Sequence, residues 1–388
     1  SHSWKDKHNL FVTLGMQAED YNCKEFSAGR EGIIVNGIYS LNNTTGLDGN
    51  GKPKDADVSG WTGNWANVGF FGRVTYNYKE RYLFEGNARY DGSSRFRREG
   101  RWVWSPSFSA AWNMAKENFW KPFEEYVNLF KIRASYGKLA NQNTQSWYPT
   151  YAVMNIGTNQ GTWLVDGKQT NIANAPALVS SSLTWENVKT FDVGFDLGAL
   201  GNRLTVSFDW FRRDTENMVG PAPVLPSALG KEPPTTNNTS LKTTGWELSM
   251  GWKDRILDFN YGIDLSLSDN QTVITDYPAT VRDVDKNFAG KHVGDIYGYT
   301  TIGIAKSNQE MKNHLTSLPN GGQTAIGSNW STGDVMYEDI NGDGKVDDGD
   351  GTIDNPGDLT VIGNSEARYR IGINLYLSWR GLDCSMFW

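Results

Sequence analysis

The sequence has no long apolar run and very little cysteine, and both shortages narrow the class of protein. Its 388 residues include only two cysteines, Cys23 and Cys384, which are too few for a disulfide scaffold. No stretch approaches the ~18 apolar residues that a transmembrane helix needs, which excludes a helical membrane protein. Strands that cross a membrane are not excluded, because only one side of each strand is then apolar.

Basic charge and catalytic motifs are also scarce. The formal net charge is −7 and the pI about 5.3, so a broad basic surface for nucleic acid is not expected. The four histidines show no metal-ligand spacing, and neither a nucleophile elbow nor a phosphate-binding loop occurs. We therefore expect neither an enzyme nor a nucleic-acid-binding protein.

Large aromatic rings carry much of the apolar content. Hydrophobic residues make up only 38% of the chain, while aromatics reach 13% with 16 tryptophans. Rings with a polar edge suit surfaces that are half apolar and half wet, including membrane interfaces.

Apolar and polar residues alternate along most of the chain, with the period of β-strands. The clearest run has one wholly apolar side, formed by Leu257, Phe259, Tyr261, Ile263, Leu265 and Leu267. Alternation predicts strands at 9–18, 68–79, 82–91, 101–113, 129–139, 188–197, 203–212, 243–253, 257–268, 369–379 and 382–388. Most reach the ~9–11 residues of a tilted membrane strand, whereas strands of soluble proteins usually run about 5–6.

The connections between these strands alternate between short and long. The short ones are 79–81, 198–202, 253–256 and 379–383, with a longer link at 114–128 that can hold a small helix. The long ones are 19–67, 91–100, 140–187, 213–242 and 269–367. A meander with turns at one rim and loops at the other produces this order, whereas a Greek-key sandwich mixes them. The sequence predicts an all-β, transmembrane, up-and-down antiparallel β-barrel with short periplasmic turns and long extracellular loops.

About eleven strands can be counted, whereas single-chain bacterial barrels have even numbers of strands and must close. No leader segment opens the sequence and its end continues a strand pattern, so we expect a fragment of a larger, plugged barrel of roughly 22 strands. Residues 1–388 are then one partial barrel domain, without plug or N-terminal extension. Residues 269–366 are its long extracellular loop region.

A series of short motifs occurs in an order similar to that of one known family. They are 87–96 (NARYDGSSRF), 131–141 (KIRASYGKLAN), 185–186, 189–190, 202–210, 244–247 (TGWE), 294–299 (GDIYGY), 333–350 and 362–364 (IGN). On these residues the chain resembles the barrel of SusC-like TonB-dependent transporters, the outer-membrane glycan importers of Bacteroidetes. One departure is local, because the family usually has a proline soon after the last motif, where this chain has Ser365, Glu366 and Ala367.

The resemblance implies TonB-dependent import of oligosaccharides across the bacterial outer membrane, with a SusD-like surface lipoprotein as a lid. TonB would act through segments absent from this chain, lipid or lipopolysaccharide would surround the barrel, and transporter–lipoprotein pairs can assemble further. Two alternatives stay open. The same barrel can import peptides, siderophores or cobalamin, or the chain can be a secreted, calcium-stabilised β-rich carbohydrate-binding protein or adhesin.

An acidic segment at 339–350 fits the twelve-residue calcium-loop pattern. Its expected ligands alternate along the chain: Asp339, Asn341, Asp343, Lys345 through its carbonyl, Asp347 and Asp350. Oxygen ligands at alternate positions can encircle a cation of calcium's size. We expect a structural calcium ion here, and the alternative is an acidic, solvated loop.

Five tryptophans fall in the long connections: Trp61, Trp65, Trp147, Trp163 and Trp330. Flat rings stack on the apolar faces of sugars, so these residues are candidates for cargo binding. The alternative is that they pack the barrel mouth or form interfacial belts.

Charged residues also occur on the polar sides of the predicted strands, including Arg73, Glu85, Arg89, Asp209 and Asp264. In a barrel these side chains face the wet lumen, and we expect most to pair with one another or to be hydrated.

Overall fold

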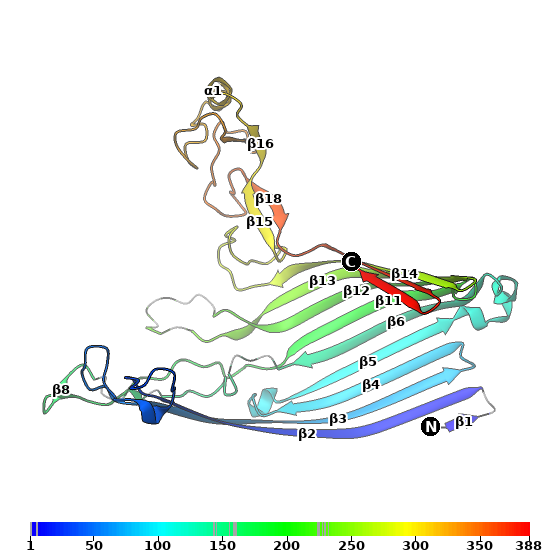
Figure 1. Ribbon diagram of the computed structural model, residues 1–388, viewed down its shortest axis with the longest axis horizontal. Helices are drawn as coiled ribbons and strands as arrows, with labels where there is room; N and C mark the ends of the chain where they lie inside the picture. Colours follow the sequence, from blue (N-terminus) through cyan, green and yellow to red (C-terminus); the bar gives the residue numbers. More distant parts are fainter. Residues whose placement is uncertain are drawn as a thin grey trace.

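Twelve strands of the computed structural model form one antiparallel sheet in which the long strands pair in chain order (Figure 1). The structure describes residues 2–4, 7–142, 144, 146–154, 156–157, 161–222, 226, 228, 230–231 and 233–388. The sheet strands are β1 (His2–Trp4), β2 (His8–Gly29), β3 (Asp57–Tyr78), β4 (Tyr82–Ser93), β5 (Trp102–Asn113), β6 (Val127–Asn141), β11 (Glu186–Ala199), β12 (Leu204–Gly220), β13 (Thr236–Ile256), β14 (Phe259–Asp276), β19 (Tyr369–Trp379) and β20 (Leu382–Phe387). The predicted up-and-down meander is therefore confirmed.

Two features of the sheet differ from the sequence prediction. The three-residue strand β1 adds a twelfth member, because a strand so short leaves no visible alternation. β2 and β3 run for 22 residues each and stay paired from His8↔Tyr78 to Gly29↔Asp57. The predicted strands 9–18 and 68–79 ended where the regular alternation of apolar and polar residues ends. Backbone pairing continues beyond that point.

The short connections are tight turns with backbone conformations that few residues adopt. Lys79 and Glu80 both have positive φ angles, of 52° and 57°, between β3 and β4. The turn between β19 and β20 uses Arg380 and Gly381, with φ of 48° and 87°. Two consecutive positive φ values give the hairpin turn whose twist matches that of the flanking strands. The link after β5 holds two 3-10 helices, η3 (Met114–Lys116) and η4 (Asn118–Phe123).

One face of the sheet, called the apolar face below, is made of hydrophobic rows that run across the strands. One such row consists of directly paired residues on β6, β11, β12, β13, β14 and β19: Phe130, Leu197, Val206, Met250, Leu265 and Ile373. No residue of this row is buried, and Ile263 in the next row is 41% exposed. Soluble monomers rarely expose apolar patches larger than a few hundred Å², so this face requires an apolar surrounding.

Aromatic rings border the apolar face at both ends of the strands. Toward the short turns, three pairs of rings are stacked: Tyr78 with Tyr82, Tyr82 with Trp112, and Trp120 with Phe130. Toward the long loops, the Tyr90 ring lies 4.8 Å from that of Trp102, and Phe191 contacts Trp210. Two such belts mark the levels where hydrocarbon gives way to headgroups.

The opposite face, called the polar face, carries charged side chains that pair with one another. Arg133 contacts both Asp196 and Asp209, and Lys131 lies 2.7 Å from Asp196. The predicted pairing of wall charges is found for Arg73 with Glu85 at 3.8 Å and for Arg89, which pairs with Asp91 at 2.8 Å.

The region after β14 is a folded unit that stands away from the sheet (Figure 1). This outer module contains the antiparallel pair of β15 (Asp295–Tyr299) and β18 (Leu359–Asn364), the pair of β16 (Thr301–Ile304) and β17 (Val335–Tyr337), and helix α1 (Asn308–Ser317). Its core is Ala305, Met311 and Met336, with Leu315 and Trp330 packed against it. The sequence placed a long loop at 269–366, whereas β14 continues to Asp276 and the module is ordered beyond it.

In the parts of the other long connections that the structure describes, the elements are all short. They are η1 (Leu41–Asn43), η2 (Arg98–Gly100), β7 (Ile156–Gly157), β8 (Leu164–Val165), β9 (Lys168–Gln169) and β10 (Ile172–Ala173). No helix in the described part of the chain is long and apolar enough to span a bilayer.

Candidate functional site

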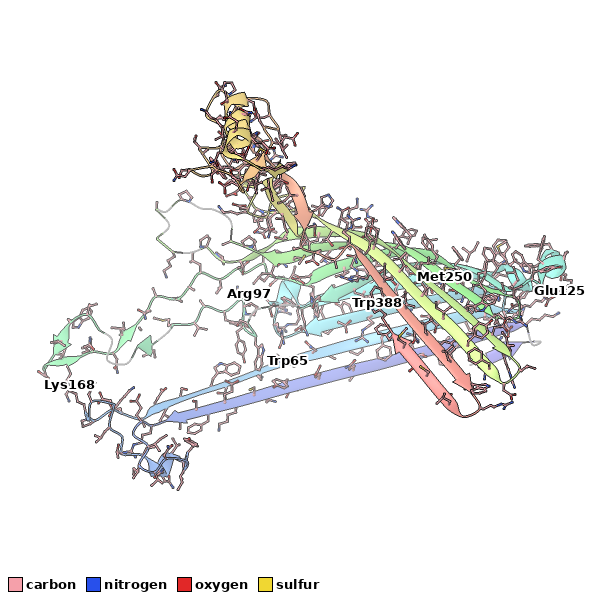
Figure 2. The ribbon with its side chains drawn as sticks, turned by 45° about the horizontal axis from the view of Figure 1, so that its top comes forward. Trp65, Arg97, Glu125, Lys168, Met250 and Trp388 are labelled. Carbon is pink, nitrogen blue, oxygen red and sulfur yellow. The ribbon has the colours of Figure 1, made fainter. Side chains whose placement is uncertain are left out.

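Four aromatic residues form one cluster on the polar side of the extended β2–β3 hairpin. Tyr21 of β2 stacks on Trp65 of β3 with ring centroids 5.5 Å apart. The rings of Tyr21 and Trp147 meet edge to face, and their centroids are also 5.5 Å apart. Trp147 comes from the connection after β6 and lies 4.9 Å from Trp61. The structure thus brings together three of the five tryptophans that the sequence singled out. Figure 2 labels Trp65 on this hairpin.

Local backbone features create this cluster. Trp61, Gly63 and Trp65 alternate along β3, so all three point to one side of the hairpin. A side chain at Gly63 would lie within 2.5 Å of the Trp61 ring and 2.9 Å of the Trp147 ring, so only glycine leaves room for both indoles. The hydroxyl of Tyr148 accepts a hydrogen bond from the Asn64 N–H at 2.9 Å and anchors the Trp147 segment. The Arg95 guanidinium lies 5.1 Å above the Trp65 ring.

A polar cleft of about 360 Å³ lies next to this cluster on the same side of the sheet. Its polar lining residues come from β2, β3, β4 and the end of β6: Gln17, Glu19, Asn67, Arg89, Asp91, Asn141 and Gln142. Glu19 pairs with Asn67 one step along the face from the Tyr21–Trp65 pair, so cleft and rings are continuous. Of these residues the sequence singled out only Arg89, as a charge of the barrel wall, because a polar residue on the wet side of a strand gives no signal of a binding site.

The other two tryptophans lie elsewhere. Trp163 directly precedes β8, which pairs with β9, and it is 64% exposed. Figure 2 labels Lys168 of β9 at the far end of the connection after β6. Trp330 packs against the core of the outer module, and its Nε1–H donates to the carbonyl of Gln323 at 3.2 Å. Trp330 therefore has a packing role within the module.

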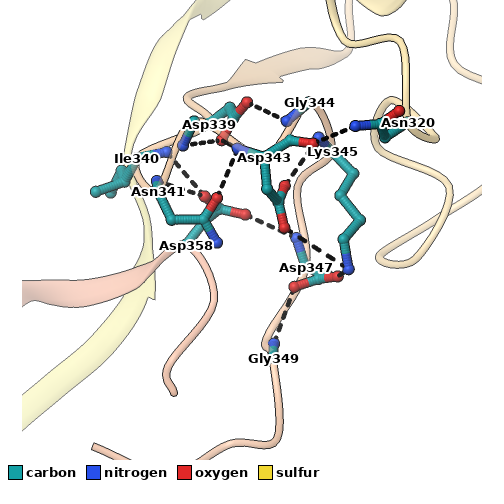
Figure 3. A network of polar contacts seen from close by, with 11 residues as sticks. Asn320, Asp339, Ile340, Asn341, Asp343, Gly344, Lys345, Asp347, Gly349 and Asp358 are labelled. Carbon is teal, nitrogen blue, oxygen red and sulfur yellow. Dashed lines mark hydrogen bonds and ion pairs between the residues drawn. The ribbon is translucent and has the colours of Figure 1, made fainter. Parts of the chain in front are cut away.

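The acidic loop 339–350 folds around its own backbone (Figure 3). The carboxylate of Asp339 accepts hydrogen bonds from the N–H groups of Gly342 and Gly344 at 2.7 and 2.8 Å. Asn341 accepts from the Asp343 N–H, and the Lys345 ammonium contacts the Asp347 carboxylate. This contact is the main cause that holds the pKa of Asp347 below its ordinary value.

Asp358, a residue outside the twelve-residue pattern, joins the two halves of the loop. It is fully buried, and its carboxylate accepts from the N–H groups of Ile340 and Asp347 at 2.8 and 2.9 Å. Asp350 instead accepts from Thr352 in its own turn. Within the described ranges, no three His, Cys, Asp or Glu side chains converge as a metal cage. In this conformation the carboxylates of Asp339, Asp343 and Asp347 are therefore bound by backbone N–H groups and by Lys345.

Residues 3–381 match the family model described as TonB dependent receptor-like, beta-barrel. TonB-dependent receptor P3 of Formosa agariphila is 27% identical over 98% of this chain and 36% of its own length. TonB-dependent receptor SusC of Bacteroides thetaiotaomicron is also 27% identical, over 73% of this chain and 28% of its own. The chain thus spans about a third of the length of these curated relatives.

Solved structures with the same fold include the RagAB peptide importer in its open-open state. It covers all of this chain with a TM-score of 0.74 and 19% identity, while 38% of that chain is covered. The RagAB peptide transporter gives a TM-score of 0.73 at 20% identity, with 39% of that chain covered. These likenesses support the fold and leave the cargo open.

The family match covers nearly the whole sequence, and it fits the exposed apolar face, the two aromatic belts and the charged polar face. It confirms the outer-membrane location and the prediction that the chain is not an enzyme. The chain belongs to the TonB-dependent receptor β-barrel family and forms part of the wall of a bacterial outer-membrane barrel.

Proposed function

We propose that this chain is part of a transporter that imports oligosaccharides across the outer membrane under TonB control. The observation that carries the proposal is the continuity of the aromatic cluster with the polar cleft on the lumen side. Sugars present apolar ring faces and many hydroxyls, so they need flat aromatic surfaces beside amides and carboxylates. Trp65 and Tyr21 supply the rings, and Asn67 and Asp91 supply hydrogen-bonding groups.

Peptides are the second candidate cargo. The solved structures with the same fold are described as a peptide importer, and their likeness covers the whole of this chain. Amides, carboxylates and the Arg89 guanidinium in the cleft can also bind a peptide backbone and its termini. The aromatic cluster favours the oligosaccharide, because a peptide backbone does not need stacked rings.

Partners of the whole transporter follow from the position of the loops. We propose that a SusD-like surface lipoprotein covers the long loops and the outer module, so that cargo is enclosed between this lid and the aromatic cluster. TonB would act through parts of the protein outside this chain, and pairs of transporter and lipoprotein would assemble further.

The full-length transporter with its lipoprotein tests the cargo, in a deletion strain supplied with defined oligosaccharides and peptides. We expect Trp65→Ala to reduce oligosaccharide uptake several-fold, because stacking contacts of about 1 kcal/mol each are lost. Trp163→Ala, an exposed tryptophan outside the cluster, should leave uptake unchanged. Uptake of peptides alone, or equal effects of both variants, would contradict the oligosaccharide assignment.

We also propose that the 339–350 loop binds a structural calcium ion. Asp339, Asn341, Asp343 and Asp347, the Lys345 carbonyl and Asp350 would be its ligands. The turns of the loop already gather oxygen atoms, and its acidic residues have one nearby ammonium, that of Lys345. Binding would require the Lys345 ammonium to leave Asp347, and Asp350 to turn away from Thr352.

A further inference from the structure

Basic side chains lie along the outer border of the apolar face on four neighbouring strands. In the strand register, Lys138 of β6 lies directly opposite Lys189 of β11. On its other side, Lys189 lies directly opposite Asp214 of β12. Asp214 in turn lies directly opposite Lys242 of β13 in the strand register. Arg212 lies two residues before Asp214 on β12. We call Lys138, Lys189, Arg212 and Lys242 the cationic rim.

The cationic rim points outward, to the side of the membrane lipid. Strand residues separated by an even number share one face. Lys138 is two residues beyond Tyr136, and Arg212 is two beyond Trp210, both toward the long loops. Lys189 lies two residues before Phe191, again on the long-loop side. Because Tyr136, Phe191 and Trp210 end the apolar rows, the rim lies at the level of the headgroups of the outer leaflet.

The charges of the rim are only partly neutralised within the chain. Lys189 lies 2.6 Å from Glu216, and Arg212 lies 2.9 Å from Asp214. Lys138 and Lys242 form no ion pair with any described residue. Two positive charges are thus left over, on a chain whose net charge is −7.

Lys138 lies directly opposite Lys189, and Glu216 neutralises only one of these two ammonium groups. Like charges directly opposite on neighbouring strands destabilise the sheet. The strands are ~4.8 Å apart, so both ammonium groups can reach one anion lying between them. A phosphate accepts several charge-assisted hydrogen bonds at once, which suits a group of lysines with an arginine.

We propose that the cationic rim binds a phosphate group of an anionic lipid in the outer leaflet. The apolar rows begin directly below the rim, so the acyl chains of the same molecule would lie along them while its phosphate meets the lysines. A free anion could neutralise the lysines but would leave these rows unused. Lys138 and Lys242 are the main phosphate ligands, since Lys189 and Arg212 already have carboxylate partners.

Native mass spectrometry of the full-length transporter in detergent tests this site, with bisphosphorylated and dephosphorylated lipid A as probes. The wild type should retain the phosphorylated lipid preferentially. Lys138→Gln with Lys242→Gln should weaken its binding roughly 30-fold, since each basic residue near a charged lipid surface contributes about 1 kcal/mol. Lys138→Arg with Lys242→Arg should restore binding. Lys7→Gln with Lys121→Gln removes the same charge at the short-turn end and should have no effect.

Three results would overturn the proposal. The first is equal retention of phosphorylated and dephosphorylated lipid by the wild type. The second is the same loss of binding in the rim and control variants, or none in either. The third is a change in the variants that does not concern the lipid phosphate. Displacement of the lipid by millimolar inorganic phosphate would make the rim a general anion site. Loss of a co-purifying protein from the variants while lipid is retained would make the rim a protein contact.

Discussion

The indole of Trp147 lies 4.9 Å from that of Trp61, although Trp147 belongs to the connection after β6 and Trp61 to strand β3. Gly63 makes this contact possible, because any side chain there would lie within 2.9 Å of both rings. The arrangement fixes a tryptophan from a long loop over a strand of the barrel wall. It thereby forms a ring surface beside the polar cleft.

Replacement of Gly63 by alanine should separate the two indoles. We expect about fivefold weaker binding of the cargo oligosaccharide, since one aromatic contact of about 1 kcal/mol is lost. Titration calorimetry of the full-length transporter measures this. Gly29→Ala on β2 is the control, because a side chain there would meet only Asp57 at 3.8 Å. Equal affinity of Gly63→Ala and wild type would remove the cluster from the account of cargo binding.

Gln323 should be essential for the outer module. Its side-chain amide is fully buried, and it donates to the carbonyl of Val335 at 3.2 Å and accepts from the N–H of Tyr337, both on β17. It also accepts a hydrogen bond from His314. The amide thereby satisfies backbone groups of β17 that a neighbouring strand would otherwise bind. Gln323→Leu leaves these groups unpaired and should destabilise the module by about 1–3 kcal/mol. Hydrogen exchange of 295–364 in the full-length protein measures the loss. Gln309→Leu on the exposed side of α1 should change little, and equal exchange in both variants would argue against this role.

Low pH should loosen the acidic loop before the sheet. The Lys345 ammonium and the Gly349 N–H hold the pKa of Asp347 below its ordinary value. A depressed native pKa gives stability that is complete above the unfolded value of ~3.9 and is lost as pH falls through the native one. Hydrogen exchange of the loop should therefore rise below about pH 4 in wild type. Asp347→Asn should show a smaller rise, and an unchanged pH profile would contradict the assignment.

Calcium should bind the 339–350 loop with a dissociation constant of roughly 10⁻⁴–10⁻³ M, the range of extracellular calcium modules. Titration calorimetry of the full-length protein measures this, with magnesium as the comparison. Asp339→Asn combined with Asp343→Asn should abolish the calcium heat, and Asp354→Asn outside the loop should not. No heat and no change in module stability with millimolar calcium would eliminate the site.

The strands could be predicted from the sequence because the membrane imposes a strict rule on them. Residues such as Ile263 and Leu265 must face lipid at every second position, and a tight turn such as Lys79–Glu80 leaves no room for a loop. Beyond the membrane the strands no longer need an apolar residue at every second position, so the predicted strands 9–18 and 68–79 were too short. The outer halves of β2 and β3 stay paired through their backbones after the regular alternation has ended, so the alternation did not show where the strands end.

The site was only partly predictable for similar reasons. The tryptophans could be chosen by type and by their place in long connections, but the contact of Trp147 with Trp61 depends on tertiary structure. Asp358 was missed because it lies beyond the calcium-loop pattern. Helix α1 did leave a signal, since Ser307 accepts from the Glu310 N–H while Glu310 accepts from the Lys306 N–H. The Ser-x-x-Glu spacing at 307–310 shows this cap in the sequence.

Arginine placed on one face or the other of β13 tests the central claim most directly. Met250, which Figure 2 labels, lies in the middle of an apolar row. Ser249 is the residue before it on the strand and therefore faces the opposite side. Met250→Arg should reduce the folding free energy of the full-length transporter in lipid vesicles by about 2–4 kcal/mol, while Ser249→Arg should change it by less than about 1 kcal/mol. Equal effects, or a larger loss at Ser249, would mean that the apolar face does not meet lipid.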